Sequence, residues 1–301
     1  MDNRSVGVFD SGLGGLSFVR RLNSLLPSEN VVYLGDTARV PYGSRTPEDI
    51  LNYTLQDMAF LRRKNVKVIV AACGTASSAA LPAIYEAIID GALLGGESAR
   101  LMNSLDFSAE PFGDSLRLLS GGVPVLGVVD SAAHAACRLC VNGRIGILGT
   151  ESTIRSGAYS RAVSLINADF ECFSVACPLF VPLVENGYTD HPATKIIAEE
   201  YLSPLIEADV DTIILGCTHY PLLRGLLESI TDGAVEYVDS GGQAAEFTAQ
   251  CLQNRDMLSS SHKGENHFFV TDNTDGFASI GARFLGSQGL DSVQKVSVDC
   301  F

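Results

Sequence analysis

Basic residues are scarce in this sequence. Lysine and arginine together number 21 against 35 aspartates and glutamates, which gives a formal net charge of −14 at neutral pH. Nucleic acids and anionic membrane surfaces are bound mainly through clustered positive charge, and no cluster of basic residues stands out along the chain. We therefore expect neither nucleic acid nor a membrane as a partner. An anionic substrate would have to be held by local hydrogen-bond donors.

Long hydrophobic runs are also absent. No stretch approaches the roughly 20 apolar residues that span a bilayer, and the polar residues Met1–Ser5 do not form an export signal. Eight cysteines are spread over 301 residues. Without an export signal, such cysteines are typical of reduced thiols rather than of a disulfide scaffold. We expect a cytoplasmic protein.

Motifs for metals and cofactors are incomplete. Cys137 and Cys140 form a single C-x-x-C pair, but neither a second pair nor a histidine pair at zinc-finger spacing accompanies them. The glycine-rich turn after the first strand lacks the third glycine of the dinucleotide fingerprint, because Ser17 stands at that place after Gly12 and Gly14. None of the five lysines lies in a motif for a Schiff base with pyridoxal phosphate. We expect no metal and no cofactor.

The sequence does contain a regular alternation of strand and helix patterns. The hydrophobic fraction is 46% and the charged fraction 19%, as in a packed globular protein. Strand-like runs lie at 6–9, 31–34, 68–72, 124–129, 145–150, 170–176, 212–215, 235–239 and 267–272, with helical patterns between most of them. This alternation predicts βαβ units and an α/β fold with mainly parallel sheets.

One plan of spacing is used twice. The first strand turns at Asp10, and its counterpart turns at Thr150. The next strand is centred 23 residues later in both cases, near Tyr33 (33 − 10) and near Phe173 (173 − 150). Equal spacing of this kind indicates an internal duplication. We therefore predict two similar doubly wound lobes, related by a pseudo-twofold axis, with the active site in the cleft between them.

The boundaries of the lobes follow from the positions of these elements. We assign residues 1–95 and 242–286 to the first lobe and residues 123–241 to the second. The last strand and helix are given to the first lobe because it otherwise has fewer elements. Residues 96–122 are predicted to form a connecting or inserted segment, and residues 287–301 a loosely held C-terminal tail.

Two cysteines occupy equivalent places in the two halves. Cys73 follows the strand at 68–72, Cys217 follows the strand at 212–215, and a helical pattern begins after each. Open α/β sheets bind ligands at such strand ends, and a helix N-terminus favours the thiolate form of cysteine. A single free cysteine is most often a buried apolar residue. Two thiols facing one carbon, however, could remove a proton from one side and return one to the other, which inverts a stereocentre.

Polar residues beside these strand ends are further candidates. Ser11, with the helix N-terminus after the first strand, could hold part of a small anion, while Asp10 could hold a cation or orient a proton. His219 lies two residues after the second cysteine and could relay protons to it. Glu185 by itself is an ordinary loop acid. The stretch Pro41–Gly43 is equally consistent with a plain turn and with a ligand contact.

Five motifs follow one another along the chain, namely Asp10-Ser11-Gly-x-Gly-Gly, Pro41-Tyr42-Gly43, Ala72-Cys73-x-Thr75-Ala76, Pro182-Leu183-Val184-Glu185-x-Gly187 and Gly216-Cys217-Thr218-His219-Tyr220-Pro221. Together they resemble the glutamate racemases of the aspartate/glutamate racemase superfamily, from Val6 to about Leu285. The resemblance implies a cofactor-independent isomerase that interconverts L- and D-glutamate, the latter for bacterial peptidoglycan, cell-wall biogenesis and cell shape. We also expect a homodimer.

The resemblance further implies roles for individual residues. Cys73 would deprotonate D-glutamate and Cys217 would deprotonate L-glutamate. Asp10 and His219 would assist the two thiols, with Glu185 close to His219. The residues implied to contact the substrate are Asp10, Ser11, Pro41, Tyr42, Gly43, Gly74, Thr75, Thr150, Thr218 and His219. No arginine lies within the motifs, so backbone amides and hydroxyls would stabilise the deprotonated intermediate.

Two features depart from the family pattern. Gly74 stands where the family usually has asparagine, which removes an amide that would touch the substrate. The segment at 90–122 is longer than is usual for the family. Because of Gly74, a racemase of aspartate or of another small amino acid, with the same two thiols, is the leading alternative. A small-ligand binding protein with idle thiols and a nucleotide-dependent oxidoreductase are the others.

Overall fold

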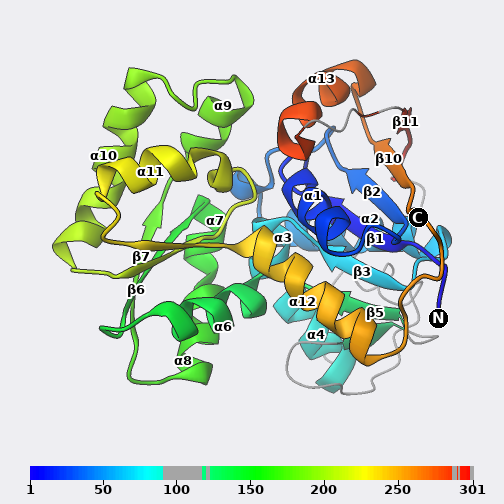
Figure 1. The fold of residues 1–301 in the computed structure, drawn as a ribbon, viewed down its shortest axis with the longest axis horizontal. Helices are drawn as coiled ribbons and strands as arrows, with labels where there is room; N and C mark the ends of the chain where they lie inside the picture. The colour runs from blue at the N-terminus through cyan, green and yellow to red at the C-terminus, as the bar shows by residue number, and fades with distance from the viewer. Residues whose placement is uncertain (91–116, 120–122, 287–289, 291, 299–301) are drawn as a thin grey trace.

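The computed structural model describes residues 1–90, 117–119, 123–286, 290 and 292–298. Two α/β lobes lie side by side in it, and each is built on a sheet of its own (Figure 1). The strands of both sheets are mainly parallel. The fold class predicted from the alternating patterns is therefore confirmed.

The larger sheet belongs to the first lobe. Its strands, in spatial order, are β11 (Val293–Lys295), β10 (Asn266–Val270), β2 (Val31–Gly35), β1 (Val6–Asp10), β3 (Val68–Ala71), β5 (Val123–Leu126) and β4 (Arg117–Leu119). Neighbouring strands are parallel except β4, which runs antiparallel to β5. The register places Val8 of β1 between Tyr33 of β2 and Val70 of β3. Coverage of both faces accounts for the continuous apolar runs of these strands.

The smaller sheet belongs to the second lobe and is parallel throughout. Its spatial order is β7 (Glu171–Ala176), β6 (Arg144–Gly149), β8 (Thr212–Leu215) and β9 (Glu236–Asp239). Strand β6 lies between β7 and β8, just as β1 lies between β2 and β3. This repeated order agrees with the duplicated plan expected from the equal spacing.

Helices connect the strands within each lobe. Those of the first lobe are α1 (Leu16–Leu25), α2 (Pro47–Arg63), α3 (Gly74–Ala79), α4 (Leu81–Asp90) and α13 (Thr274–Leu285), with the short 3-10 helix η1 (Tyr42–Ser44) before α2. Those of the second are α6 (Val129–Leu139), α7 (Glu151–Ser156), α8 (Ala158–Ile166), α9 (Phe180–Glu185), α10 (Pro192–Glu207), η2 (Tyr220–Leu223) and α11 (Arg224–Ile230). Helix α12 (Ser240–Asn254) leads back to the first lobe and contacts both α1 and α6 (Figure 1).

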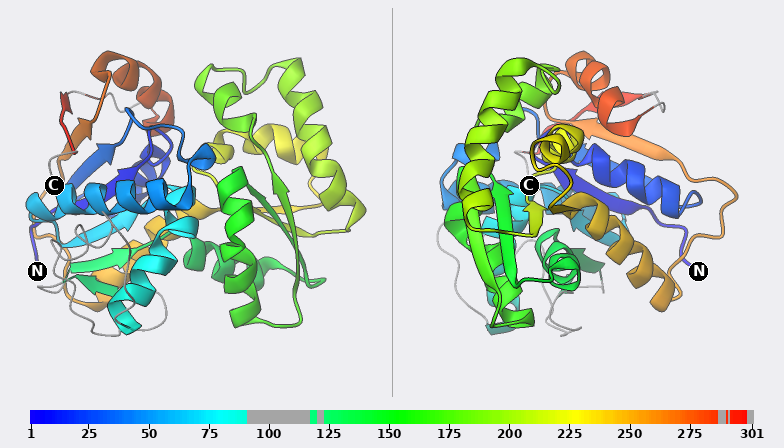
Figure 2. Two further views of the ribbon diagram at one scale, coloured as in Figure 1. Left: turned by 180° about the vertical axis from the view of Figure 1, so that it is seen from behind. Right: turned by 60° about the vertical axis from the view of Figure 1, so that its left-hand side comes forward.

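The core of the first lobe is divided between the two faces of its sheet, because successive side chains of a strand point to opposite faces. Val6 and Val8 are buried in one cluster with Leu16 of α1. Phe9, the next residue of β1, is buried in another cluster with Leu55 of α2. Helices α1 and α2 therefore cover opposite faces of the sheet, as the views in Figure 2 show.

Two predicted boundaries differ from the structure. Strand β5 begins at Val123 and pairs with β3, so residues 123–126 belong to the larger sheet and not to the second lobe. Strand β11 lies in the predicted loose tail, but it pairs with β10. A strand pattern predicts an extended segment without saying which sheet it joins, and a strand of three residues leaves almost no periodic signal. The predicted segment 96–122 lies outside the described residues except for 117–119.

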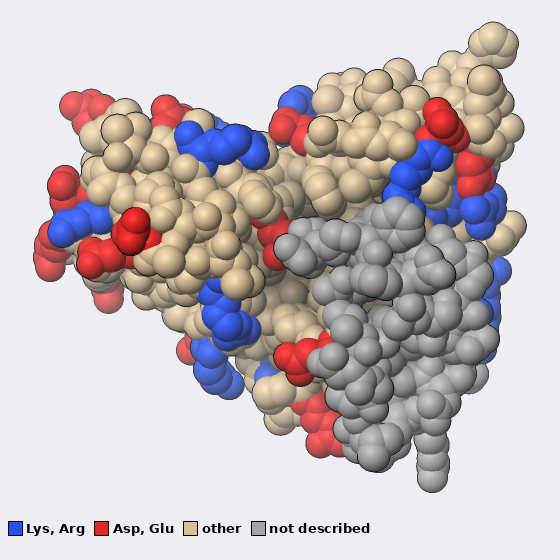
Figure 3. Space-filling view, turned by 90° about the horizontal axis from the view of Figure 1, so that it is seen from below, with Lys and Arg blue, Asp and Glu red and all other residues tan. Residues whose placement is uncertain are grey.

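The surface carries charges of both signs. On the face shown in Figure 3, basic and acidic side chains are interspersed among uncharged ones, and the described part of this face has no broad basic patch. Across the described segments, no helix combines the length and the apolar character that crossing a membrane requires.

Candidate functional site

Polar residues from both lobes meet where the carboxyl ends of their central strands face each other. Strand β1 ends at Asp10, and β6 ends just before Thr150. Cys73 and Cys217 each stand two residues after the last residue of a strand, β3 and β8 respectively. Each lobe gathers its turns on one edge, because neighbouring parallel strands end together. The two edges touch, since Thr75 Oγ1 of the first lobe lies 3.0 Å from Thr150 Oγ1 of the second.

Cys73 is the N-cap residue of α3, and only 4% of its surface is exposed. Its sulfur accepts a hydrogen bond from the backbone N–H of Ala76 at 3.5 Å, and its S–H donates to Ser11 Oγ at 3.6 Å. Burial, reinforced by the nearby carboxyl of Asp10, raises the pKa of Cys73 to about 12. At neutral pH Cys73 is therefore a thiol and holds a proton that it can donate.

Asp10 lies between the two cysteine-bearing turns. Its carboxylate accepts hydrogen bonds from the backbone N–H of Gly12 at 2.8 Å and from the hydroxyl of Thr218, in the other lobe, at 3.5 Å. Burial raises the pKa of Asp10, while the charge of His219 acts in the opposite direction. A buried carboxyl with a raised pKa beside a thiol is suited to proton transfer.

His219 joins Cys217 to Glu185. Its Nδ1 lies 3.9 Å from the sulfur of Cys217, and its Nε2 lies 3.0 Å from Oε1 of Glu185. Burial lowers the pKa of His219, but the hydrogen bonds to Cys217 and Glu185 outweigh burial and raise it to about 10. The imidazole is therefore protonated at neutral pH. A positive charge beside a cysteine favours the thiolate form.

The two thiols consequently have different surroundings. Cys73 faces a carboxyl and a hydroxyl, whereas Cys217 faces a protonated imidazole. A sulfur that holds its proton and a sulfur beside a protonated imidazole together suit acid/base chemistry on opposite sides of one carbon.

The Pro41–Gly43 motif is only partly directed toward this site. The hydroxyl of Tyr42 is buried in the first lobe, 2.5 Å from Asp36 Oδ2 and 2.9 Å from Asp57 Oδ2, so the predicted presentation of this hydroxyl to a ligand differs from the structure. Pro41 is exposed. Contacts across or within the two edges bring together the remaining predicted residues, Asp10, Ser11, Gly43, Cys73, Gly74, Thr75, Thr150, Glu185, Cys217, Thr218 and His219.

Two residues of the site were not predicted. Phe284 of α13 packs edge-on against the His219 ring, with centroids 5.3 Å apart. Gly14 lies against the second lobe, where a Cβ atom added to it would come within 2.0 Å of Thr218 Oγ1. The helical pattern near Phe284 predicts burial, and the glycine-rich turn predicts tight backbone geometry. Neither signal reveals a neighbour that is distant in sequence.

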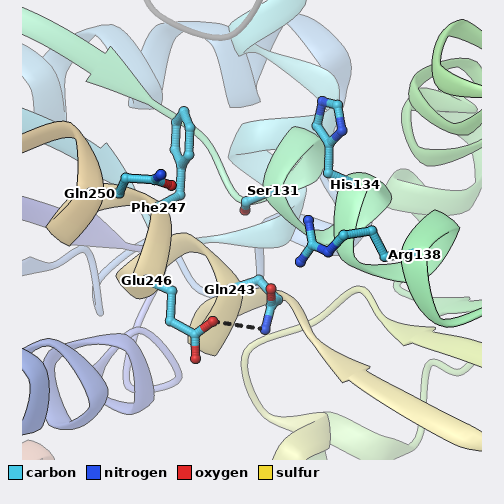
Figure 4. Close-up of a pocket in the computed structure, with 7 residues that line it drawn as sticks. All are labelled: Ser131, His134, Arg138, Gln243, Glu246, Phe247 and Gln250. Carbon is cyan, nitrogen blue, oxygen red and sulfur yellow. Dashed lines mark hydrogen bonds between the residues drawn. The ribbon is translucent and has the colours of Figure 1, made fainter. Parts of the chain in front are cut away.

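A hollow lies between α6 and α12 (Figure 4). Its lining comes from Ser131, His134, Arg138, Gln243, Glu246, Phe247 and Gln250. None of these belongs to the predicted site, so this hollow and the cysteine-bearing turns are separate features. Among the residues that the structure describes, no three histidine, cysteine, aspartate or glutamate side chains are grouped so that they could hold a metal ion.

The sequence is similar to many curated proteins along nearly its whole length. It is 39% identical over 297 residues to the glutamate racemase of Geobacter metallireducens, an alignment that covers 98% of this chain and 97% of that protein. It is 38% identical over 296 residues to the glutamate racemase of Neisseria meningitidis serogroup B, with 98% and 97% covered. A family model described as Asp/Glu/Hydantoin racemase matches residues 107–248.

The fold is similar to solved structures as well. The glutamate racemase of Francisella tularensis, solved in complex with D-glutamate, gives a TM-score of 0.83 at 31% identity, with 100% of both chains covered. The glutamate racemase of Thermus thermophilus, solved in complex with beta-chloro-D-alanine, gives a TM-score of 0.79 at 36% identity, with 99% of this chain and 98% of that chain covered.

Proposed function

This chain belongs to the glutamate racemase family of isomerases, and from that premise we propose that it interconverts L- and D-glutamate with its two cysteines and without a cofactor. One observation carries the proposal: a buried thiol from each lobe stands at the facing strand ends, and each has its own proton-handling partner. The relative solved with D-glutamate supports the choice of substrate.

The reaction moves two protons across one carbon. Starting from L-glutamate, the Cys217 thiolate takes the α-proton, so the C–H bond breaks and an S–H bond forms. The Cys73 thiol then gives its proton to the opposite face of the carbon and becomes a thiolate. Starting from D-glutamate, the same steps run from Cys73 to Cys217. Charge balances in both directions, because the proton that one sulfur gains is matched by the proton that the other sulfur gives up.

The surroundings of the thiols favour one starting state. Protonated His219 places a positive charge 3.9 Å from the Cys217 sulfur, and Glu185 holds the ring in place. Cys73, whose pKa is raised to about 12, stays protonated. The substrate-free enzyme is therefore poised to deprotonate L-glutamate. For the reverse direction, Asp10, whose carboxyl acts on the Cys73 thiol, would assist the loss of the Cys73 proton.

Neutral donors stabilise the deprotonated intermediate. The hydroxyls of Ser11, Thr75, Thr150 and Thr218 lie at the facing edges, together with the backbone N–H groups of the turns. Donors fixed in a water-poor site act strongly on developing negative charge, and loss of one typically slows a reaction about 100- to 1,000-fold. In the cell, the product D-glutamate would supply peptidoglycan synthesis in the cytoplasm, and the enzyme would act as a homodimer.

Circular dichroism of L- and D-glutamate in deuterium oxide tests the proposal. The parent enzyme should racemise both enantiomers and introduce deuterium at the α-carbon. Cys73→Ser and Cys217→Ser should each lower the racemisation rate about 100- to 10,000-fold. Cys251→Ser is the matched control, because this half-buried cysteine lies in α12 away from the site. Faster turnover of aspartate would overturn the choice of glutamate, and full activity of either site variant would overturn the two-thiol mechanism.

A further inference from the structure

We propose that three glycines of the first lobe set the separation of the two thiols, an inference that rests on the proposed racemase function. The residues are Gly14, Gly43 and Gly74, and we call them the glycine seam. Each lies so close to the second lobe that an added Cβ atom would come within 3.0 Å of it. The two cysteine-bearing edges are thus in direct contact. Of the three glycines, Gly74 is the one that meets backbone atoms of the second lobe.

Gly74 packs on the backbone of the opposite cysteine turn. A Cβ atom at Gly74 would lie 2.2 Å from the carbonyl oxygen of Gly216, 3.2 Å from its carbonyl carbon and 3.6 Å from Cα of Cys217. Gly74 directly follows Cys73, and Gly216 directly precedes Cys217. The contact therefore joins the two residues that adjoin the two thiols.

Backbone hydrogen bonds hold both sides of this contact in place. The backbone N–H of Gly216 donates to the carbonyl of Leu148 in β6 at 2.8 Å. A Cβ atom added at Gly216 would lie 2.9 Å from that carbonyl oxygen and 3.0 Å from the Tyr159 ring, so Gly216 is itself closely packed. Gly74 opens α3, whose first turn is closed by the bond from Ser77 N–H to the Cys73 carbonyl at 2.9 Å.

The other two seam contacts are with side chains. A Cβ atom at Gly14 would lie 2.0 Å from Thr218 Oγ1, and one at Gly43 would lie 2.9 Å from Cβ of Thr150. Rotation can move the Thr218 hydroxyl out of the way, but the Cβ atoms of Thr150 and Thr218, at 2.9 and 2.7 Å, and the backbone carbonyl of Gly216 cannot rotate away. The clash at Gly74, at 2.2 Å from a backbone atom, therefore needs a larger shift of one lobe against the other than the clash at Gly43, at 2.9 Å.

Such a movement would act on catalysis more than on binding. Relief of the clash at Gly74 needs a shift of roughly 1 Å, and a misplacement of that size costs about 100-fold in rate. Both thiols must reach the same carbon in one turnover, whereas the substrate is held by several separate donors. We therefore expect Gly74→Ala to lower kcat about 100-fold, with a much smaller change in KM.

The rate of cysteine alkylation supplies a readout that does not depend on racemase activity. Cys73 and Cys217 are only 4% and 7% exposed, so iodoacetamide should label them slowly in the parent protein. If the turns separate in Gly74→Ala, peptide mass spectrometry should show faster labelling at both sites. Cys177, which is 0% exposed, should stay unlabelled unless the whole fold opens.

Matched variants complete the experiment. Gly225→Ala is the control, because within the described part of the chain, its own stretch of α11 aside, no atom lies within 4 Å of an added Cβ there. Its kcat and labelling should equal those of the parent. Gly43→Ala, which meets a side chain, should show a smaller effect in the same direction, and it tests the seam if Gly74→Ala does not fold. Gly74→Asn should be at least as slow as Gly74→Ala.

Three results would overturn the inference. The first is a Gly74→Ala variant whose alkylation rates and kcat equal those of the parent. The second is the same result for Gly43→Ala. The third is a gain of activity in Gly74→Asn, which would mean that position 74 matters only through the missing amide. If the parent itself does not racemise glutamate, the proposed function fails, but the labelling rates still decide whether the seam holds the two turns together.

Discussion

Glu185 Oε1 lies 3.0 Å from His219 Nε2, although 34 residues separate the two in the sequence. Glu185 is the last residue of α9, and His219 stands in the turn after β8. The pair fixes the imidazole beside Cys217 and keeps it charged. The charge of the His219 ring therefore depends on the carboxylate of Glu185. This carboxylate is not itself fully buried, since 29% of the Glu185 side chain is exposed.

Replacement of Glu185 by glutamine should change the pH dependence of activity. The hydrogen bonds that the protonated ring donates to Cys217 and Glu185 raise the pKa of His219 from 6.5 to about 10, so its proton is lost only at alkaline pH. In Glu185→Gln this pKa falls, and the alkaline decline of kcat/KM for L-glutamate should move to lower pH. Glu199→Gln on α10 is the control, because this exposed residue pairs with Lys195, at 3.8 Å, on the same helix. An unmoved alkaline limb in Glu185→Gln would contradict the role given to the pair.

The same pair makes stability depend on pH. A histidine whose pKa is raised in the folded state stabilises the protein fully below its unfolded pKa, and this contribution is lost as the pH rises through the folded pKa. The contribution of His219 to the free energy of unfolding should therefore be complete below pH 6.5 and disappear toward pH 10. Urea denaturation of the parent and of Glu185→Gln should give a difference that shrinks over this range.

Asp10→Asn should have opposite effects on two measurements. Racemisation should slow about 100-fold, because a group that assists proton transfer is lost. Alkylation of Cys73 at a fixed pH should become faster, because the Asp10 carboxylate contributes to the raised pKa of this thiol. Asp169→Asn, at an exposed position, should change neither rate. Slower alkylation of Cys73 in Asp10→Asn would show that the carboxylate does not oppose the thiolate.

Lys67 and Glu29 form a buried ion pair at 2.5 Å, with side chains 0% and 2% exposed. Lys67 also donates to the carbonyl oxygens of Asp2 and Met257, both at 2.7 Å. Lys67→Met should lower the free energy of unfolding by about 3–5 kcal/mol, because it leaves the Glu29 carboxylate buried without its partner. The double variant Lys67→Met/Glu29→Gln should recover part of this loss in urea denaturation. A double variant less stable than Lys67→Met would contradict the explanation.

Thr46 is the N-cap residue of α2, and its hydroxyl accepts a hydrogen bond from the backbone N–H of Asp49 at 3.2 Å. Thr46→Ala should lower the free energy of unfolding by about 1 kcal/mol, since a helix donor loses its partner. Thr46→Ser keeps the accepting oxygen and should remain close to the parent in thermal or urea denaturation. Equal stability of the alanine and serine variants would show that the cap contributes nothing.

The sequence alone determined the strand ends that carry the chemistry. An apolar run, a turn and a helical pattern are local signals, so the places of Asp10, Cys73, Thr150 and Cys217 at strand ends could be predicted and are found in the structure. The equal spacing in the two halves likewise predicted the repeated strand order. The family motifs added Glu185, for which the local pattern gave no role.

Only the tertiary structure decided how these strand ends meet. The assignment of β5 to the larger sheet, the packing of Phe284 on His219 and the contact of Gly74 with Gly216 all join segments that are far apart in the chain. Local periodicity records which side of an element is buried but not what buries it. Each thiol's place at a strand end is therefore determined by its own stretch of sequence. The distance between the two thiols is determined by the packing of the lobes.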